Sequence, residues 1–329
     1  MIEILSASAL ATVQDLGRNG ALQWGVGTSG AMDPLALAGG NLLLGNDEGA
    51  AAIEVPVFPF QVRFTADCVF ALTGTDCAAR LDDMPLLPWW TQVARAGQLL
   101  HLGVPHPGRW RASRAYLCLA GGIGVPAVLG SRSTQLRGAF GGFEGRTLRQ
   151  GDSLRAATPG AGRQLAGFGL VPPALALPLE ADGVPAMRVL PAAEYPLFTE
   201  AARAAFWERD WKITAQSDRY GYRLAGPELA LATAVEMRSH GIVPGVIQVP
   251  PGGQPIVQMR DAQPSGGYPK IGTVIEADLW RLGQAPIGSH VRFVETTWDQ
   301  AVAALDETRR WLDEARRLVD LHRGQSGKE

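Results

Sequence analysis

The sequence predicts a mainly β fold with few helices, and its composition and the placement of its turns support that prediction. Glycine and proline number 40 and 23 in a chain of 329 residues, about a fifth of the whole against an average of roughly 12%. They are spread between short runs of Val, Ile, Leu and Phe, as turn residues are between the strands of barrels and sandwiches. The length is sufficient for two packed lobes.

The expected first lobe contains several short strands and one helix. A strand is expected within residues 2–13. Asp33-Pro34 marks a helix start, with an N-cap aspartate followed by proline at the first helical position. This helix should cover residues 35–44 and end at Gly45-Asn46. Further strands, separated by turns, are expected at residues 51–57, 61–64, 69–72, 98–102 and 114–119.

The Ala-, Pro- and Gly-rich residues 156–183 are expected to connect this lobe to a second one. The second lobe should contain a helix near residues 196–207 and a hairpin over residues 245–259, with its turn at Pro250-Pro251-Gly252-Gly253. Its other strands are expected at residues 187–190, 274–276 and 290–295.

A final amphipathic helix is expected over residues 299–321. Its apolar stripe should consist of Val302, Leu305, Leu312 and Val319, with most charged side chains on a solvated face. The predicted organisation is therefore a first lobe at residues 1–185, a second at 186–297, and a C-terminal helix and tail at 298–329.

Composition and local pattern exclude several classes of protein. The formal net charge of -2 provides no basic face for nucleic acid. No stretch approaches the roughly 20 apolar residues of a membrane helix, and the N-terminal segment, with Glu3, lacks the features of an export signal. The cysteines (Cys68, Cys77 and Cys118) do not indicate a disulfide framework. The histidines have no metal-ligand spacing, so we expect no metal site. Without an export signal, a membrane helix or a disulfide framework, we expect a cytoplasmic protein.

Two polar loops flanked by glycine are candidates for substrate binding. Asp15 and Arg18 lie in one loop, where the guanidinium could orient a carboxylate or an amide; a turn bonded to the backbone is the alternative. Ser131 and Thr134 follow Gly130 and suit contacts to an oxyanion or a phosphate. An ordinary Ser/Thr turn is equally consistent with that segment.

Residues 25–30 form a literal G-x-G-x-x-G, the pattern of dinucleotide-binding loops. That fingerprint requires a buried apolar strand directly before its first glycine. The polar residues Asn19, Gly20 and Gln23 occupy that position instead, so dinucleotide binding is not expected. An anion-binding loop and a plain tight turn both remain open.

The densest group of polar side chains lies in residues 247–270. Alternation sets Gln248 apart from its neighbours, which fits a residue at the mouth of a barrel. Asp261, Gln263, Tyr268 and Lys270 supply an acid, an amide, a phenol and an amine within one loop. This set suits proton transfer next to an amide or carboxyl carbon, while a structural hairpin is the alternative. For His240, an exposed turn histidine is the simplest interpretation.

The order of the motifs along the chain resembles a single family. The segments that carry the resemblance are Gln14-Asp15-Leu16-Gly17-Arg18, Gly30-Ala31-Met32-Asp33, Ile53-Glu54, Leu129-Gly130-Ser131-Arg132-Ser133-Thr134, Ser217-Asp218-Arg219-Tyr220-Gly221, Gly245-Val246-Ile247-Gln248 and Gly266-Gly267-Tyr268-Pro269-Lys270. On these motifs the chain is identified as a member of the family that is variously labelled 5-oxoprolinase C subunit, KipA-like, allophanate hydrolase subunit 2 or biotin-dependent carboxyltransferase. The resemblance covers residues 4–294.

The resemblance implies two cyclophilin-like β-barrel lobes and a role within a larger complex. The implied complex is an ATP-dependent 5-oxoprolinase that opens 5-oxoproline to glutamate, with a KipI-like protein and a LamB/YcsF-type protein as partners. One alternative is the carboxyltransferase component of a biotin-dependent urea or amide carboxylase. Another is a non-enzymatic protein that antagonises a KipI-like regulator.

The chain is expected to hold no tightly bound cofactor. It has no P-loop, so ATP would be used by the complex. It also has no biotinylation motif, so biotin would be carried by another domain and only in the carboxyltransferase alternative.

The same motifs imply a set of site residues for a small amide or carboxylate substrate. The predicted catalytic residues are Asp261, Tyr268 and Lys270. The predicted substrate-binding residues are Asp15, Arg18, Asp33, Asn41, Glu54, Ser131, Thr134, Arg219 and Gln248. The sequence departs from the usual family pattern at Tyr220, at His240 and at Pro264-Ser265.

Overall fold

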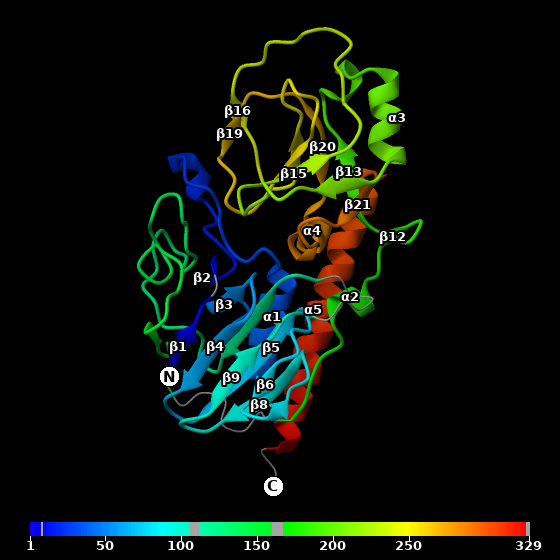
Figure 1. The fold of residues 1–329 in the computed structure, drawn as a ribbon. Coiled ribbons are helices and arrows are strands. Elements are labelled where there is room, and N and C mark those ends of the chain that lie inside the picture. The colour runs from blue at the N-terminus through cyan, green and yellow to red at the C-terminus, as the bar shows by residue number, and fades with distance from the viewer. Residues whose placement is uncertain (8, 106–111, 160–166, 327–329) are drawn as a thin grey trace. The chain divides into compact units, whose positions relative to one another are not determined.

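The computed structural model describes residues 1–7, 9–105, 112–159 and 167–326, and Figure 1 shows its fold. The chain divides into two compact units. Unit 1 comprises Met1–Arg18, Ser29–Ala176 and Arg309–Glu329, and unit 2 comprises Asn19–Thr28 and Leu177–Thr308. Residues 160–166 of the predicted connection lie outside the described residues.

Unit 1 is built on two antiparallel sheets that enclose a common apolar core. The order of the first sheet is β11-β1-β4-β9-β6-β7 and that of the second is β2-β3-β10-β5-β8. The strands of the first sheet are β11 (Ser153–Leu154), β1 (Ile2–Ser6), β4 (Phe60–Phe64), β9 (Leu99–Leu102), β6 (Arg80–Leu81) and β7 (Met84–Pro85). Those of the second are β2 (Thr12–Gln14), β3 (Ala52–Val55), β10 (Ala115–Leu119), β5 (Cys68–Gly74) and β8 (Trp90–Ala94).

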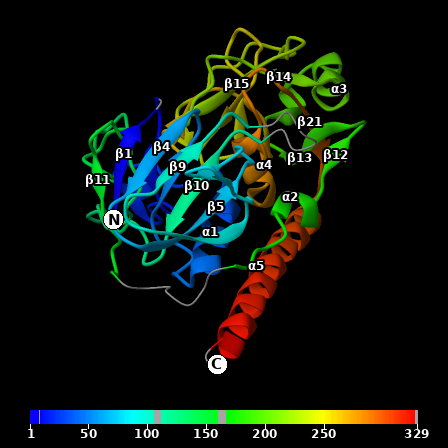
Figure 2. The same ribbon diagram turned by 60° about the horizontal axis from the view of Figure 1, so that its bottom comes forward.

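The second sheet is buried on both faces. Because side chains alternate along a strand, Leu117 of β10 points into the core between the sheets. Its neighbours Tyr116 and Cys118 point to the other face, which helix α1 (Pro34–Leu44) covers. Figure 2 shows this helix beside β5 and β10. Gly40 permits the close approach, because a Cβ there would lie 2.6 Å from the Cys118 sulfur.

Unit 2 contains a closed β-barrel. Its strands follow the order β12-β13-β20-β17-β18-β15-β14-β21, and a parallel pairing of β13 with β21 closes the ring with β12 outside it. The strands are β12 (Glu180–Ala181), β13 (Val184–Pro191), β20 (Lys270–Val274), β17 (Val246–Gln248), β18 (Ile256–Gln258), β15 (Gly221–Ala225), β14 (Trp211–Ile213) and β21 (His290–Glu295). A separate pair consists of β16 (His240–Gly241) and β19 (Ser265–Gly266).

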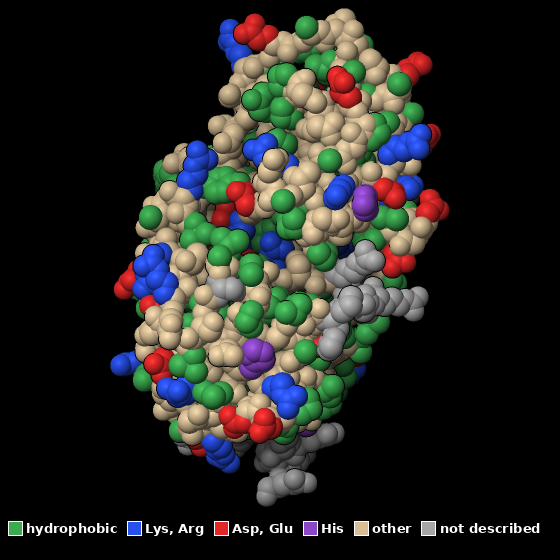
Figure 3. Space-filling view, in the orientation of Figure 1, with side chains coloured by type: hydrophobic (Ala, Val, Ile, Leu, Met, Phe, Trp, Pro, Cys, Tyr) green, Lys and Arg blue, Asp and Glu red, His purple; other side chains and the backbone are tan. Residues whose placement is uncertain are grey.

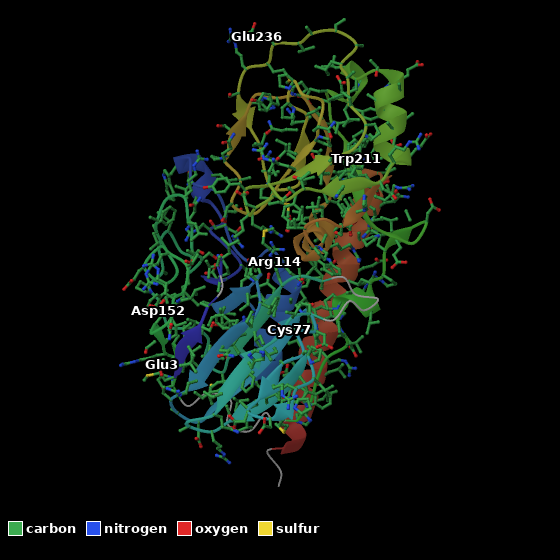
Figure 4. All side chains as sticks on the ribbon, viewed as in Figure 1. Glu3, Cys77, Arg114, Asp152, Trp211 and Glu236 are labelled. Atoms are coloured by element: carbon green, nitrogen blue, oxygen red, sulfur yellow. The ribbon has the colours of Figure 1, made fainter. Side chains whose placement is uncertain are left out.

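Helix α3 (Glu200–Glu208) packs on the barrel through aromatic side chains. Phe206 of α3 stacks on Phe293 of β21 with ring centroids 5.0 Å apart. The indole of Trp211, labelled in Figure 4, is fully buried and donates to the carbonyl oxygen of Phe206 at 3.2 Å. The prediction of a mainly β chain with a C-terminal helix is confirmed.

Most predicted elements are present, with differences at their ends. The expected helix at residues 35–44 is α1, capped by Asp33, which accepts from the Ala36 amide at 2.9 Å. The expected hairpin at residues 245–259 is formed by β17 and β18. The expected opening strand is two strands, β1 and β2, which belong to different sheets. The short strands β6, β7 and β8 were not predicted.

Two further expectations differ from the structure near helix starts, and a third agrees with it. The helix expected from residue 196 begins at Glu200, because Pro196 lies in a separate 3-10 helix, Tyr195–Leu197, and Thr199 caps α3. The strand expected at residues 274–276 is wrong beyond Val274: a 3-10 helix, Glu276–Asp278, follows and leads into α4 (Leu279–Gln284). This turn buries Asp278 against Arg188, whose guanidinium donates to it at 2.9 and 2.8 Å. Residues 21–24 form a 3-10 helix, so no strand precedes the G-x-G-x-x-G segment.

The last helix, α5, runs from Trp298 to Ser326 and is the long red helix in Figure 2. The prediction of its apolar stripe is wrong in part. Val302 is 44% exposed, while Val319 is buried. The other buried positions on this helix are Ala304, Thr308 and Ala315. Small side chains let a helix approach its neighbours closely. A stripe defined only by large apolar residues therefore missed the face of α5 that is buried.

Charged side chains of both signs are interspersed over the face of the molecule in Figure 3. In the described part of the chain, no helix combines the length and apolar character needed to span a bilayer. The same residues contain no group of three or more His, Cys, Asp or Glu side chains suited to a metal ion.

Asp152 makes a pH-dependent contribution to the stability of unit 1. The Arg146 guanidinium donates to it at 2.7 and 2.9 Å, and these bonds hold the pKa of the carboxyl below its ordinary value. Asp152→Asn is expected to lower the free energy of unfolding at pH 7 by about 1.5–3 kcal/mol, the contribution of hydrogen bonds to a charged group.

The pH profile of this difference gives the control. A lowered carboxyl pKa stabilises the fold above the unfolded value of about 3.9, and the stabilisation is lost as the pH falls through the folded pKa. Unfolding midpoints of the wild type and the variant should therefore converge below about pH 3.9. A constant gap between neutral pH and strongly acidic pH would show that Asp152 acts in another way.

Candidate functional site

A row of buried polar side chains crosses the second sheet of unit 1 under α1. Glu54 of β3 is paired with Thr12 of β2 on one side and with Tyr116 of β10 on the other. Tyr116 is in turn paired with Thr73 of β5. All four residues have no exposed surface. Directly opposed residues on one face lie close enough to interact, so the register of the sheet assembles this row.

The polar row binds the segment that begins α1. Glu54 Oε2 accepts from the Met32 amide at 2.8 Å and from the Tyr116 hydroxyl at 2.7 Å. The Asp33 amide donates to the Tyr116 hydroxyl at 2.8 Å. Burial, followed by the charges of Glu54 and Asp33, raises the pKa of Tyr116 well above its usual range. The phenol is therefore a permanent hydrogen-bond donor to Glu54 at neutral pH.

Arg114, which directly precedes β10 and is labelled in Figure 4, completes this group. Its Nε lies 3.8 Å from Glu54 Oε1, and both side chains are almost fully buried. The structure thus brings together two predicted substrate-binding residues, Asp33 and Glu54. It adds Tyr116 and Arg114, which sequence reasoning missed. A tyrosine inside the otherwise apolar run Ala115–Leu119 was the available signal.

Asp15 and Ser131 also lie together in unit 1. Asp15 Oδ1 accepts from the Ser131 hydroxyl at 2.6 Å and from the Gly17 amide at 2.8 Å, and its Oδ2 accepts from the Arg132 amide. Thr134 donates its hydroxyl to the Val13 carbonyl oxygen at 2.9 Å. These bonds hold the two loops to each other. The bond from the Gly17 amide to Asp15 is the backbone-bonded turn considered as the alternative for that loop.

Arg18 is buried among backbone carbonyls. Its Nε donates to the Val128 carbonyl at 3.2 Å, its Nη2 donates to the carbonyl of Ser133, and its guanidinium lies 4.8 Å from the centroid of the Phe140 ring. It has no exposed surface. Asn41 is similarly engaged with the loop after α1, because its Nδ2 donates to the Ala50 carbonyl at 2.7 Å. Substrate contacts by either residue stay a prediction.

Glycine is required at position 30, which lies against Gly17 and shortly before the start of α1. Its φ is +94°, and a Cβ there would lie 2.9 Å from the Gly17 amide nitrogen. Gly30→Ala is therefore expected to destabilise unit 1 by at least about 1–2 kcal/mol, from backbone strain together with the clash. Gly97→Ala is a matched control, since Gly97 has a φ of +93° and no atom within 4 Å of the added Cβ. Denaturant unfolding should show the larger loss for Gly30→Ala, and equal losses would exclude the contact with Gly17.

Unit 2 brings together Arg219 and Asp261, which are both buried. The Arg219 guanidinium donates to the two carboxylate oxygens at 2.9 and 3.1 Å. The Asp261 amide also donates to the Arg219 carbonyl at 2.8 Å. A bidentate pair of this kind fixes the orientation of both planar groups.

A second cluster in unit 2 surrounds Lys270. Its Nζ lies 2.7 Å from Glu194 Oε1 and also contacts Nε2 of His240. Across the ladder from Lys270 stands Gln248, which is 3% exposed and accepts from Gln258 Nε2 at 3.1 Å. We name Glu194, His240, Gln248 and Lys270 the lysine cluster. His240 is half-buried and paired, so the expectation of an exposed turn histidine is wrong.

The predicted catalytic residues differ in their surroundings. Both carboxylate oxygens of Asp261 are occupied by Arg219, and Lys270 is held by two partners. Tyr268 is 48% exposed and presents its phenol at the surface of unit 2. The lysine cluster supplies an amine, a carboxylate, an imidazole and an amide for binding and proton transfer. Glu194 was not among the predicted residues.

Comparison with known proteins defines the class to which this fold and these clusters belong. Residues 24–295 match the model of the carboxyltransferase domain, subdomain A and B, and the chain belongs to that family. The family resemblance inferred from the motifs is thereby confirmed.

Two relatives match nearly the whole chain. The chain is 42% identical to the 5-oxoprolinase C subunit of Escherichia coli over 95% of this chain and 97% of the relative. It is also 42% identical to the corresponding C subunit of Haemophilus influenzae, with 97% and 99% covered. The relatives therefore connect the chain to enzyme complexes.

A solved structure extends the comparison to a larger enzyme. The crystal structure of the Kluyveromyces lactis urea amidolyase matches with a TM-score of 0.85 at 28% identity. The match covers 95% of this chain but 20% of that protein. The chain thus corresponds to one part of the yeast enzyme.

Proposed function

We propose that this chain is one component of a cytoplasmic, ATP-dependent 5-oxoprolinase complex that opens 5-oxoproline to glutamate. The observation that carries the proposal is the 42% identity to the 5-oxoprolinase C subunit of E. coli, which extends over nearly the full length of both chains. The proposed partners are a KipI-like protein and a LamB/YcsF-type protein. ATP is used by the complex, and this chain holds no tightly bound cofactor.

The chemistry is a hydrolysis: the oxygen of water bonds to the lactam carbonyl carbon, and the C–N bond breaks. It demands polarisation of the carbonyl and delivery of a proton to the leaving nitrogen. In unit 2 we assign these tasks to Lys270 and Tyr268. Asp261 is proposed to act with Arg219 as an oriented ion pair, because the guanidinium occupies both of its carboxylate oxygens. In unit 1, Asp33 and Glu54 are proposed to fix the start of α1.

An alternative function is favoured by one specific observation. The match to K. lactis urea amidolyase covers almost the whole chain at a TM-score of 0.85. A carboxyltransferase component of a biotin-dependent urea or amide carboxylase would fit that fold equally well. In that case biotin would be carried by another domain.

A comparison of substrates tests the proposal against this alternative. The chain, assembled with its KipI-like and LamB/YcsF-type partners, is incubated with ATP and 5-oxoproline. A parallel reaction contains the chain with a biotin carboxylase, a biotinylated carrier, ATP, urea and labelled bicarbonate. Glutamate release without fixation of label into urea is the expected result. Biotin-dependent fixation of label with no glutamate release would replace the hydrolase proposal by the carboxyltransferase one.

A further inference from the structure

Two buried polar atoms of the lysine cluster have no hydrogen-bond partner among the described residues. Gln248 Oε1 accepts from Gln258, but the Gln248 Nε2 donor is unpartnered. Glu194 Oε1 accepts from Lys270, but Glu194 Oε2 is also buried without a partner. Leaving a buried donor or acceptor unsatisfied costs about 1–3 kcal/mol, so an arrangement that retains one of each indicates a ligand.

Strand pairing and side-chain contacts connect the residues that carry these two atoms. Lys270 is opposite Gln248 in the ladder of β17 and β20, and its Nζ contacts both Glu194 and His240. His240 is paired with Gly266 in β16 and β19. A Cβ on Gly266 would lie 2.5 Å from Gln248 Nε2, so only glycine leaves the amide of Gln248 room at this point.

The protonation states follow from the partners. The Lys270 ammonium can only donate, so His240 Nε2 must accept from it. His240 Nδ1 lies 3.0 Å from the Arg238 carbonyl oxygen, which can only accept. In this arrangement Nδ1 is the donating and Nε2 the accepting nitrogen of His240. Glu194 and Lys270 cancel each other's charge, and a cluster without net charge favours an uncharged polar group of a ligand over a charged one.

We infer that the lysine cluster binds the amide group of a lactam. The ligand's carbonyl oxygen accepts from Gln248 Nε2, and its N–H donates to Glu194 Oε2. A lactam holds its amide in the cis form, so its acceptor and its donor lie on one edge and complement one unpartnered donor and one unpartnered acceptor. The inference rests on the proposed function and assigns the lactam group of that substrate to unit 2.

Within this site His240 is a positioning residue. It acts through Lys270, whose ammonium it holds together with Glu194. Lys270 would then stand beside the carbonyl oxygen, where a positive charge stabilises the negative charge that develops during attack.

Binding without turnover tests the inference. The assembled complex is titrated calorimetrically, in the absence of ATP, with 5-oxoproline and with its N-methyl derivative. Methylation removes the N–H that Glu194 would accept, so binding should weaken by about tenfold or more, the factor for about 1.4 kcal/mol. Gln248→Leu should weaken binding of 5-oxoproline to the same extent. The ligand comparison needs no variant, so it stands even if Gln248→Leu fails to fold.

A histidine series separates positioning from a general structural effect. His240→Leu should weaken lactam binding, while His240→Gln should restore most of it, because the glutamine oxygen can accept from Lys270. His290→Leu is the matched control, since His290 is an exposed histidine on another strand of the same unit. Equal effects of His240→Leu and His240→Gln would overturn the positioning role.

The remaining outcomes distinguish this site from the proposed function. The lactam site would be overturned by equal affinity for both ligands or by no binding of 5-oxoproline. It would also be overturned by an unchanged KM of the Gln248→Leu variant during glutamate release. The last of these would leave the proposed function standing. Lactam binding with the expected sensitivities, but no glutamate release with ATP, would support the site and overturn the proposed function.

Discussion

Glu54→Ala is expected to lower the free energy of unfolding of unit 1 by about 3–5 kcal/mol, the usual cost of removing one partner of a buried ion pair. The variant leaves the Tyr116 hydroxyl and the Met32 amide without their common acceptor. It also removes the carboxylate next to Arg114. Because Met32 directly precedes the cap of α1, the start of this helix should lose its fixed position.

Denaturant unfolding with two further variants tests this interpretation. Glu54→Gln keeps the shape and one acceptor and should cost less than Glu54→Ala. Glu3→Ala is the control, because Glu3 is a partly exposed glutamate of the same unit, whose carboxylate pairs with Arg63 at 3.3 Å near the surface. Surface pairs contribute about 0–1 kcal/mol. A loss for Glu54→Ala as small as that for Glu3→Ala would contradict the structural importance of the polar row.

Asp261→Ala is expected to destabilise unit 2 by about 3–5 kcal/mol, because it leaves the Arg219 guanidinium buried without its carboxylate. The double variant Arg219→Met with Asp261→Leu should recover much of this loss, since well-packed apolar side chains often replace a buried pair at little cost. Denaturant unfolding of the single variants Arg219→Met and Asp261→Leu and of the double variant should therefore show strong non-additivity, with the double variant losing less than the two single variants together. Additive losses would show that the two side chains contribute independently.

The elements that the sequence predicted well are those with local signals. Helix α1 has Asp33 and Pro34 at its start and Gly45 at its end, and the structure uses each of them. The β17–β18 hairpin was indicated by its alternation and by the Pro-Gly turn. The strands β6 and β7 are two residues long, too short to show any alternation.

The candidate site was predicted less well, because its geometry depends on strand register. Glu54 was indicated by the family motif Ile53-Glu54, but nothing local indicated that Tyr116 would be opposite it. Glu194 and His240 meet Lys270 from segments that are 76 and 30 residues away in the chain. The loop residues Asp15 and Ser131 were found by their chemistry, and the structure shows them bonded to each other within unit 1.

The most direct test of the central claim is release of glutamate from 5-oxoproline in the presence of ATP, measured with this chain and its purified KipI-like and LamB/YcsF-type partners. Each component is omitted in turn. The proposed function predicts ATP-dependent release that disappears when this chain is left out and returns when it is added back. Undiminished release by the two partners alone, or no release by the verified three-part complex, would contradict it.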